Sequence, residues 1–433
     1  CVDLNKNKTI WASFSNPQNG IIFPEYYLLE FSDSKKLISR KSGAVVAEYP
    51  SKAHVLVKRN MWLETETDTL GTTHYVAKDL LTGQTLWTSA LPGGSDWATW
   101  DGDKLYQVGN GLTCLDYSNG KTWSIESPTS ATEGELKAVL LNTLSLTLAA
   151  MGGGYATLHG PDRISMLSSR PLIQDDRIYF AAMKNLYCVD KNSGKIIWHT
   201  QLDVEPSKVL IRLFGNNLLL FYTGIRLKNG APSDNGFAKV LLVSTRDGHP
   251  LNEFEPEKSH TISDTVLTGN SIYLLSKEKV YLLDNNLRFI SEITGEQYGD
   301  FWSFMGPYKS HLLIRSSKGI LCLKLNPLKI NWWKELPEAP KAYGYEELQK
   351  VNQIKSKMKF SFYFTDDAIW IYNPSDYTCF RLEDGKLLLT VPIVKDSQTS
   401  YINKGYLTFY HPGRWALLKL DLIRDESVGA KNE

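Results

Sequence analysis

The chain alternates short apolar and polar runs around pairs of turns that lie 18 positions apart. In WDGDKLYQV, QDDRIYFAA, YKSHLLIR and TDDAIWIY, a polar turn is followed by an apolar segment of strand length. A second turn follows each one, and the paired positions are Gly102 and Gly120, Asp176 and Gly194, Ser310 and Leu328, and Asp367 and Gly385. Two hairpin turns with apolar strands between them predict a four-stranded antiparallel unit.

One phrase marks the second turn of these units. AKDLLTGQTLW at 77–87, CVDKNSGKIIW at 188–198 and CLKLNPLKINW at 322–332 each end on a tryptophan ten positions after the start. Shortened or eroded copies begin at residues 37, 114, 242 and 379. A four-stranded unit repeated about every 40 residues is typical of a propeller blade. We therefore predict an all-β fold, a single β-propeller of four-stranded antiparallel blades, and favour eight blades with seven as the alternative.

The turn positions also outline the domain organisation. Residues 1–19 are expected to form an N-terminal tether, residues 20–426 the propeller, and residues 427–433 a C-terminal tail. The 74 residues from Gly120 to Gly194 leave room for a degenerate blade in 136–160. Two insertions stand out: 226–236 is expected to be a polar loop, and 337–357 a longer segment with a short helix starting near Tyr345.

The copies resemble the tryptophan-docking repeat of the PQQ-like, or quinoprotein-dehydrogenase-like, propellers, which reads A-x-D-x-x-T-G-x-x-x-W. Ala77, Asp79, Thr82, Gly83 and Trp87 match this repeat completely, and the resemblance extends from about residue 37 to residue 424. In that family the tryptophan packs against the neighbouring blade. The resemblance therefore implies a structural, blade-docking role for Trp87, Trp123, Trp198 and Trp332.

Four of the five cysteines share one repeat position, six residues before the turn: Cys114, Cys188, Cys322 and Cys379. This is the alanine position of the repeat, where cysteine acts as a small buried hydrophobic residue. Equivalent positions in neighbouring blades lie on packed sheets about 10 Å apart, whereas a disulfide needs Cα atoms within about 7 Å. We therefore predict four free thiols and no disulfide framework.

Cys1 lies outside the repeat frame and precedes the polar stretch VDLNKNK. The mature chain of a bacterial lipoprotein begins with a cysteine that is lipidated when the signal peptide is removed. Acyl chains on Cys1 and a short polar tether would hold a propeller at a membrane surface. We expect lipidation of Cys1, and the alternative is a cysteine that heads the sequence by chance.

Composition and motif spacing argue against catalysis and nucleic-acid binding. The 433 residues include 48 lysines and arginines and 47 aspartates and glutamates, and this net charge of +1 gives no nucleic-acid signal. No apolar run reaches the roughly 18 residues of a transmembrane helix, and the eight histidines show no zinc-binding spacing. The pairs Asp175–Asp176 and Asp366–Asp367 fit turns better than acid–base catalysis. We expect no catalytic residue, no cofactor and no metal site.

The resemblance also extends to the BamB family of outer-membrane assembly lipoproteins, which combine an N-terminal cysteine with PQQ-like blades. It implies a non-enzymatic, periplasm-facing scaffold that is anchored by lipid to the outer membrane and binds envelope proteins as a monomer within a complex. The insertions 226–236 and 337–357 are the candidates for partner contact. The alternatives are a diverged PQQ-type quinoprotein enzyme, although the sequence lacks that enzyme's vicinal cysteine pair, and a surface lipoprotein that binds glycan or another ligand.

Overall fold

The computed structural model describes residues 2–3, 8–9, 19–67, 73–91, 97–109, 111–127, 131–133, 162–165, 167–229, 231–234, 237–257, 261–325, 327–336, 362–365, 367–372, 376–392, 399–403, 406–411 and 414–419. Cys1, the segment 136–160, the insertion 337–357 and the tail 427–433 lie outside the described residues. The predictions made for these segments therefore stay predictions.

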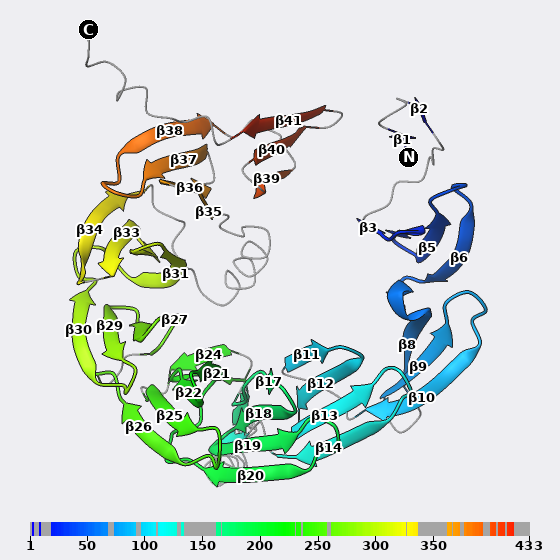
Figure 1. The fold of residues 1–433 in the computed structure, drawn as a ribbon, viewed down its shortest axis with the longest axis horizontal. Helices are drawn as coiled ribbons and strands as arrows, with labels where there is room; N and C mark the ends of the chain where they lie inside the picture. The colour runs from blue at the N-terminus through cyan, green and yellow to red at the C-terminus, as the bar shows by residue number, and fades with distance from the viewer. Residues whose placement is uncertain are drawn as a thin grey trace, which may run out of the picture. The chain divides into compact units, whose positions relative to one another are not determined.

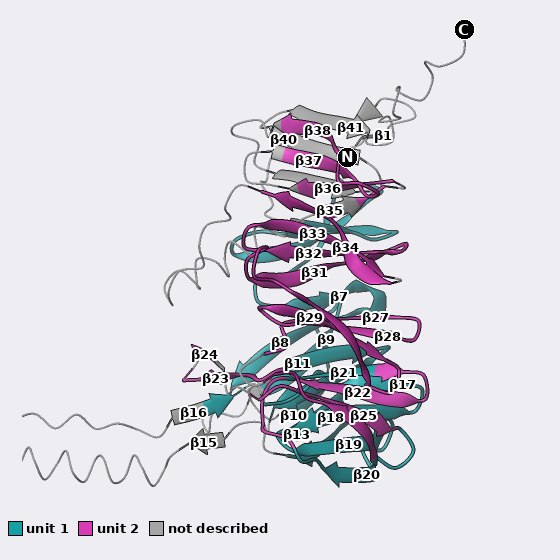
Figure 2. Ribbon diagram, turned by 90° about the vertical axis from the view of Figure 1, so that its left-hand side faces the viewer, with its two compact units in different colours: residues 1–203, 209–212, 245–249 teal, residues 204–208, 213–244, 250–433 magenta. Residues whose placement is uncertain are grey.

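The chain divides into two compact units (Figure 2). Unit 1 comprises residues 1–203, 209–212 and 245–249, and unit 2 comprises residues 204–208, 213–244 and 250–433. Within the described ranges both are built from antiparallel strands, together with the 3-10 helix η1 (Val57–Arg59). The predicted fold class is confirmed, because the chain is all-β and its four-stranded antiparallel sheets are those of a β-propeller. The number of blades stays a prediction.

Among the residues that the structure describes, unit 1 contains four four-stranded sheets in which consecutive strands are neighbours (Figure 1). Their strands are β3 (Asn19–Ile22), β4 (Tyr26–Glu30), β5 (Ser34–Ser39) and β6 (Val45–Pro50); β7 (His54–Leu56), β8 (Met61–Thr67), β9 (Thr73–Asp79) and β10 (Thr85–Leu91); β11 (Trp97–Asp101), β12 (Lys104–Gly109), β13 (Gly111–Asp116) and β14 (Thr122–Glu126); and β17 (Leu172–Gln174), β18 (Arg177–Ala182), β19 (Asn185–Asp190) and β20 (Ile196–Gln201). Two short pairs are β1 (Val2–Asp3) with β2 (Lys8–Thr9), and β15 (Ala131–Glu133) with β16 (Asp162–Ser165).

Unit 2 follows the same plan. Its described part has three complete four-stranded sheets, formed by β27 (Asp264–Thr268), β28 (Ser271–Leu275), β29 (Lys279–Asp284) and β30 (Phe289–Thr294); β31 (Phe301–Tyr308), β32 (His311–Ser316), β33 (Gly319–Leu325) and β34 (Leu328–Glu335); and β35 (Phe362–Phe364), β36 (Ala368–Tyr372), β37 (Asp376–Arg381) and β38 (Leu387–Pro392). Its other strands are β22 (Asn217–Tyr222), β25 (Lys239–Ser244) and β26 (Pro250–Phe254); the hairpin β23 (Ile225–Lys228) and β24 (Ala231–Asp234); and β39 (Thr399–Asn403), β40 (Tyr406–His411) and β41 (Arg414–Lys419). The boundary between the units also divides β21 (Val209–Phe214), of which Val209–Arg212 belongs to unit 1.

Central strands of several sheets, among them β18, β22, β29 and β32, are buried on both faces. In β22 the five residues from Leu218 to Tyr222 are all fully buried, so the strand has a continuous apolar run instead of an alternating one. Neighbouring sheets share their cores: one cluster joins the β27–β30 and β31–β34 sheets, and another joins the β31–β34 and β35–β38 sheets. Face-to-face packing of successive sheets therefore organises each unit.

A β-bulge recurs at one position of the fourth strand. In the β17–β20 sheet, Cys188 pairs with Trp198 but Val189 pairs with Ile196, which leaves Ile197 as the extra residue. Six other sheets shift register at the same place, and their extra residues are Val46, Leu86, Leu251, Ile290, Asn331 and Leu388. The β11–β14 sheet has no shift, because its copy of the repeat is one residue shorter. A bulge interrupts a free sheet edge and so hinders pairing with another chain.

Candidate interaction site

The repeat tryptophans contact the sheet that follows their own. Each donates its indole N–H to a backbone carbonyl there: Trp87 to Tyr117 at 3.1 Å, Trp198 to Thr245 at 3.1 Å and Trp332 to Leu382 at 2.8 Å. Trp123, from the shorter repeat copy, lies against Gly194 of the next sheet. The four rings are therefore used inside the fold, between one sheet and the next.

The four repeat cysteines are buried and free, as the sequence predicted: Cys114, Cys188, Cys322 and Cys379. In three of the sheets the cysteine pairs across strands with the docking tryptophan, as Cys322 does with Trp332. Burial raises the pKa of the Cys114 and Cys188 thiols to about 11 and that of Cys322 and Cys379 to about 12. A thiol with such a pKa is protonated at neutral pH and is a poor nucleophile.

The side chains of the turn aspartates accept hydrogen bonds from the backbone of their own turns. One carboxylate oxygen of Asp79 accepts the backbone N–H groups of Leu81 and Thr82 and the Thr82 hydroxyl, at 3.0, 2.8 and 2.9 Å. The backbone N–H of Thr82 and then its hydroxyl hold the pKa of Asp79 below its usual value. Asp190 is held in the same way, first by the Ser193 hydroxyl. Asp175 and Asp176 lie in the turn between β17 and β18, as expected, whereas Asp366 lies outside the described residues.

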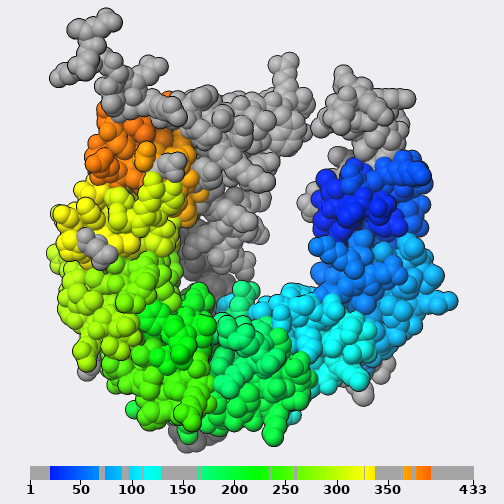
Figure 3. Space-filling view, viewed as in Figure 1, coloured from blue at the N-terminus to red at the C-terminus, as the bar shows by residue number. Residues whose placement is uncertain are grey.

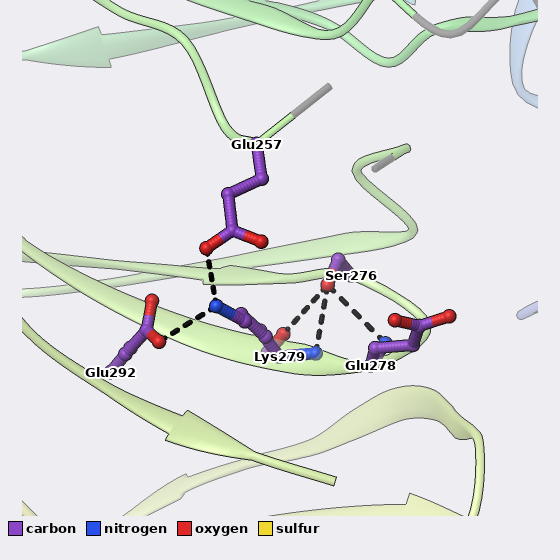
Figure 4. Close-up of polar contacts among 5 residues, drawn as sticks. All are labelled: Glu257, Ser276, Glu278, Lys279 and Glu292. Atoms are coloured by element: carbon purple, nitrogen blue, oxygen red, sulfur yellow. Dashed lines mark hydrogen bonds and ion pairs between the residues drawn. The ribbon is translucent and has the colours of Figure 1, made fainter. Parts of the chain in front are cut away.

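A lysine in unit 2 is enclosed by carboxylates (Figure 4). Lys279 forms ion pairs with Glu292 of its own sheet, at 2.8 Å, and with Glu257, which follows β26. These two hydrogen bonds, Glu257 first, raise the pKa of Lys279. The Ser276 hydroxyl accepts the Lys279 backbone N–H at 2.8 Å and closes the hairpin between β28 and β29. The cluster thus ties two neighbouring parts of unit 2 together by charge.

An aromatic patch in unit 1 is the candidate site that sequence analysis missed. Trp100 of β11 keeps 44% of its surface exposed, although it is among the largest side chains of the unit. It rests edge-on against the buried ring of Tyr117, with centroids 4.6 Å apart, and its ring is nearly parallel to that of His54, at 6.4 Å. Its place in the sequence, two residues before the turn glycine Gly102, differs from that of the docking tryptophans and was the available signal.

A guanidinium completes this patch. The Cζ atom of Arg59 lies 5.7 Å from the Trp100 ring centroid and 6.0 Å from that of Tyr117. The same side chain forms an ion pair with Asp103 and donates to the Gly102 carbonyl. Burial, and then the charge of Lys35, lowers the pKa of His54, which favours its neutral form. The residues His54, Arg59, Trp100, Asp103 and Tyr117 are called the Trp100 patch below.

The first predicted insertion has more structure than expected. Residues 226–236 were predicted to be a polar loop, but Ile225–Lys228 and Ala231–Asp234 pair as the antiparallel hairpin β23–β24. The prediction of a loop was wrong because the segment can form its own cross-strand hydrogen bonds around the turn at Asn229. Phe237, directly after this segment, is 58% exposed.

The described ranges of the chain also bear on metal binding and on membrane crossing. No group of three or more histidine, cysteine, aspartate or glutamate side chains in those ranges is placed to hold a metal ion. None of the helices found there has the length and apolar character needed to cross a membrane.

Comparisons with known proteins place the fold in a family. The structure of BamB from Moraxella catarrhalis is 12% identical, with 69% of this chain and 93% of that chain covered and a TM-score of 0.28. Hsv2p from Kluyveromyces lactis (10% identity, 72% and 96% covered, TM-score 0.34) and the dihydro-heme d1 dehydrogenase NirN (11%, 87% and 75%, TM-score 0.40) are also similar. No curated protein matches. The sequence model of the outer membrane protein assembly factor BamB matches residues 73–298, more than half of the 433 residues, and the chain therefore belongs to the BamB family of PQQ-like propellers.

Proposed function

We propose that this protein is a lipid-anchored scaffold of the bacterial cell envelope, which faces the periplasm at the outer membrane and binds partner proteins without catalysing a reaction. Its membership of the BamB family supports a β-propeller scaffold. The proposal assigns the anchor to Cys1 and partner contact to the Trp100 patch and the β23–β24 hairpin.

The observation that carries the proposal is the exposure of Trp100. Tryptophan, tyrosine and arginine are enriched among the residues that dominate binding energy in protein interfaces. The Trp100 patch brings one of each together at a surface, with Tyr117 buried beneath and Arg59 alongside. Trp87 donates to the Tyr117 carbonyl, so a docking tryptophan also supports the ring on which Trp100 rests. A contact surface held this firmly loses little conformational entropy on binding.

The reactive side chains of the repeats support binding over catalysis. The cysteine thiols have pKa values of about 11 to 12, and the Asp79 carboxylate is occupied by the N–H groups of its own turn. Lys279 is held by two glutamates. Each of these groups is engaged by the fold, whereas a catalytic group has to be available to a substrate.

The anchor is tested on Cys1. Protein from the membrane fraction of its own cells would be digested and the N-terminal peptide measured by mass spectrometry, with a diacylglyceryl thioether expected on Cys1. Cys1→Ser should release the protein from the membrane fraction without changing its melting temperature, because Cys1 lies outside the repeats. An unmodified Cys1, or a native chain that extends upstream of it, would end the anchor proposal.

Partner binding is tested on Trp100. A photo-crosslinking amino acid in place of Trp100 should trap specific envelope proteins in living cells, and the same substitution at Ile22, which is 69% exposed in the same unit, should not. Trp100→Ala should then abolish co-purification of the trapped partner while Ile22→Ala leaves it unchanged. If both positions crosslink the same proteins, or Trp100→Ala has no effect, the Trp100 patch is not the contact surface.

One alternative is favoured by the same patch. An exposed indole flanked by Arg59 and Asp103 also suits a sugar ring, which stacks on aromatic faces and hydrogen-bonds to charged neighbours. Titration with envelope oligosaccharides, followed by tryptophan fluorescence, distinguishes glycan binding from protein binding. A saturable change that Trp100→Ala removes would support the glycan function instead.

A further inference from the structure

Exposed apolar side chains recur at the start of the fourth strand in three successive sheets of unit 2. Phe289 and Ile290 of β30 are 53% and 54% exposed, Ile330 of β34 is 39% exposed, and Leu387 of β38 is 53% exposed. These strands form the outer edges of their sheets (Figure 1). Large apolar residues at such positions cost solubility, so their repetition calls for a physical explanation.

The exposed residues occupy one register position. Phe289 pairs with Leu283, Ile330 with Leu323 and Leu387 with Phe380, in each case directly before the bulge. The three sheets pack face to face in succession through shared cores, and their atoms form a continuous surface (Figure 3). The apolar groups therefore share one register position in three successive sheets of unit 2.

A cation precedes the apolar residue in each sheet. Arg288, Lys329 and Lys386 are all exposed, and no described carboxylate forms an ion pair with any of them. The nearby carboxylates of Asp284 and Asp384 accept backbone N–H groups of their own turns, at 2.8 and 2.9 Å. Residues 288–290, 329–330 and 386–387 are called the basic–apolar row.

We propose that the basic–apolar row binds the surface of a lipid bilayer that carries anionic headgroups. Apolar side chains beside lysine and arginine are the combination that inserts at the headgroup boundary while pairing with lipid phosphates. The row repeats a cation followed by an exposed apolar residue at one register position in three successive sheets, and such a repeat suits a uniform, planar partner. A protein partner would need a matching repeat of its own. The contact is independent of acyl chains on Cys1 and would orient the propeller against the membrane.

The test uses the full chain as Cys1→Ser, so that no acyl chain contributes. Co-sedimentation would be measured with vesicles of phosphatidylethanolamine and phosphatidylglycerol and with vesicles of phosphatidylcholine alone. We expect binding to the anionic vesicles that weakens at high salt. Charge reversal at Arg288, Lys329 and Lys386 should weaken it by roughly fivefold for each cation changed, and Phe289→Ser with Ile290→Ser by about tenfold or more.

The matched control is Leu86→Ser. Leu86 is 49% exposed and is the extra residue of the bulge in β10, as Ile290 is in β30, but Thr85 stands at the position of Phe289 and Gln84 at the position of the cation. This variant should bind anionic vesicles as the parent does, and all variants should keep the parent's melting temperature. The proposal is overturned if Cys1→Ser does not bind protein-free anionic vesicles, if the row variants bind as well as the parent, or if Leu86→Ser loses as much. Mass spectrometry of Cys1 judges the anchor separately.

Discussion

The indole ring of Trp332 lies so close to Gly385 of the next sheet that an added Cβ atom would be 2.7 Å from its Cδ2 atom. Three more pairs repeat this relationship, namely Trp87 with Gly120, Trp123 with Gly194 and Trp198 with Gly248. At Gly83, in the equivalent turn, an added Cβ atom would meet nothing within 4 Å. The reason is that the preceding sheet has an alanine where other sheets have the docking tryptophan. Ala47 pairs with Leu37 there, just as Trp87 pairs with Ala77 in the next sheet.

This difference predicts unequal effects of alanine at two equivalent glycines. Gly385 and Gly83 have φ angles of 68° and 70°, so alanine costs about 1–2 kcal/mol of backbone strain at either position. Gly385→Ala must also displace Trp332, and overpacking adds about 1–3 kcal/mol. Urea denaturation should show a clearly lower midpoint for Gly385→Ala than for Gly83→Ala. Equal midpoints would mean that the ring contact contributes nothing to stability.

Removal of a docking ring should be among the most damaging single changes. Trp332 is 7% exposed, and Trp332→Ala should lower the free energy of unfolding by about 3–5 kcal/mol. Trp332→Phe keeps an aromatic ring but loses the hydrogen bond from the indole N–H to the Leu382 carbonyl. Its loss of stability should be smaller than that of Trp332→Ala, and the difference between the two variants separates packing from the hydrogen bond. Trp100→Ala is the matched control, and its unfolding curve should stay near the parent's. A comparable loss at both tryptophans would contradict the structure.

The repeat thiols should be inert in the folded protein. Because burial raises their pKa to about 11 or 12, iodoacetamide at pH 8 should label Cys114, Cys188, Cys322 and Cys379 slowly in the native state. After denaturation without reductant all four should react, as mass spectrometry of the labelled peptides would show. A peptide that reacts only after reduction would reveal a disulfide and refute the repeat alignment.

The turn at Asp79 should contribute to acid sensitivity. Its pKa lies below the usual 3.8, so the stabilisation by the carboxylate is present above pH 3.8 and is lost as the pH falls through the folded-state pKa. Asp79→Asn lacks this transition, and its stability should approach the parent's as the pH is lowered from 7 to 3. Denaturation curves at pH 7, 5 and 3 measure the difference in unfolding free energy between the two proteins. If the difference in unfolding free energy between the parent and Asp79→Asn is the same at all three pH values, the charge of Asp79 does not stabilise the turn.

Addition of PQQ and calcium should not stabilise the protein. The prediction follows from the sequence, which lacks the vicinal cysteine pair of the PQQ-dependent alcohol dehydrogenases. A ligand present at 100 times its dissociation constant stabilises by about 2.7 kcal/mol, which a melting curve detects. A rise in melting temperature, or dye-linked alcohol oxidation, would support the quinoprotein alternative.

Local features of this protein could be predicted from its sequence because they depend on neighbours in the chain. The phrase from Ala77 to Trp87 contains the strand, the Asp79-capped turn and the next strand, and all three are found as expected. Cys322 could be assigned to a buried position because its place in the repeat is the same in every copy. The length of each copy also decides whether the fourth strand has a bulge, as the shorter copy before Trp123 shows.

Only the tertiary structure decided which side chains meet across sheets. A ring lies against Gly385 but not against Gly83, and the difference depends on which residue the preceding sheet has at the tryptophan position. The packing of one sheet on the next brings that residue and the turn glycine together. Trp100 and Trp332 are the same residue type, yet one is 44% exposed and the other 7%, because Trp332 packs into a core that its sheet shares with the following one. The register that aligns Phe289, Ile330 and Leu387 likewise arises from hydrogen bonds between strands, and sequence spacing does not specify that these side chains stay exposed to solvent.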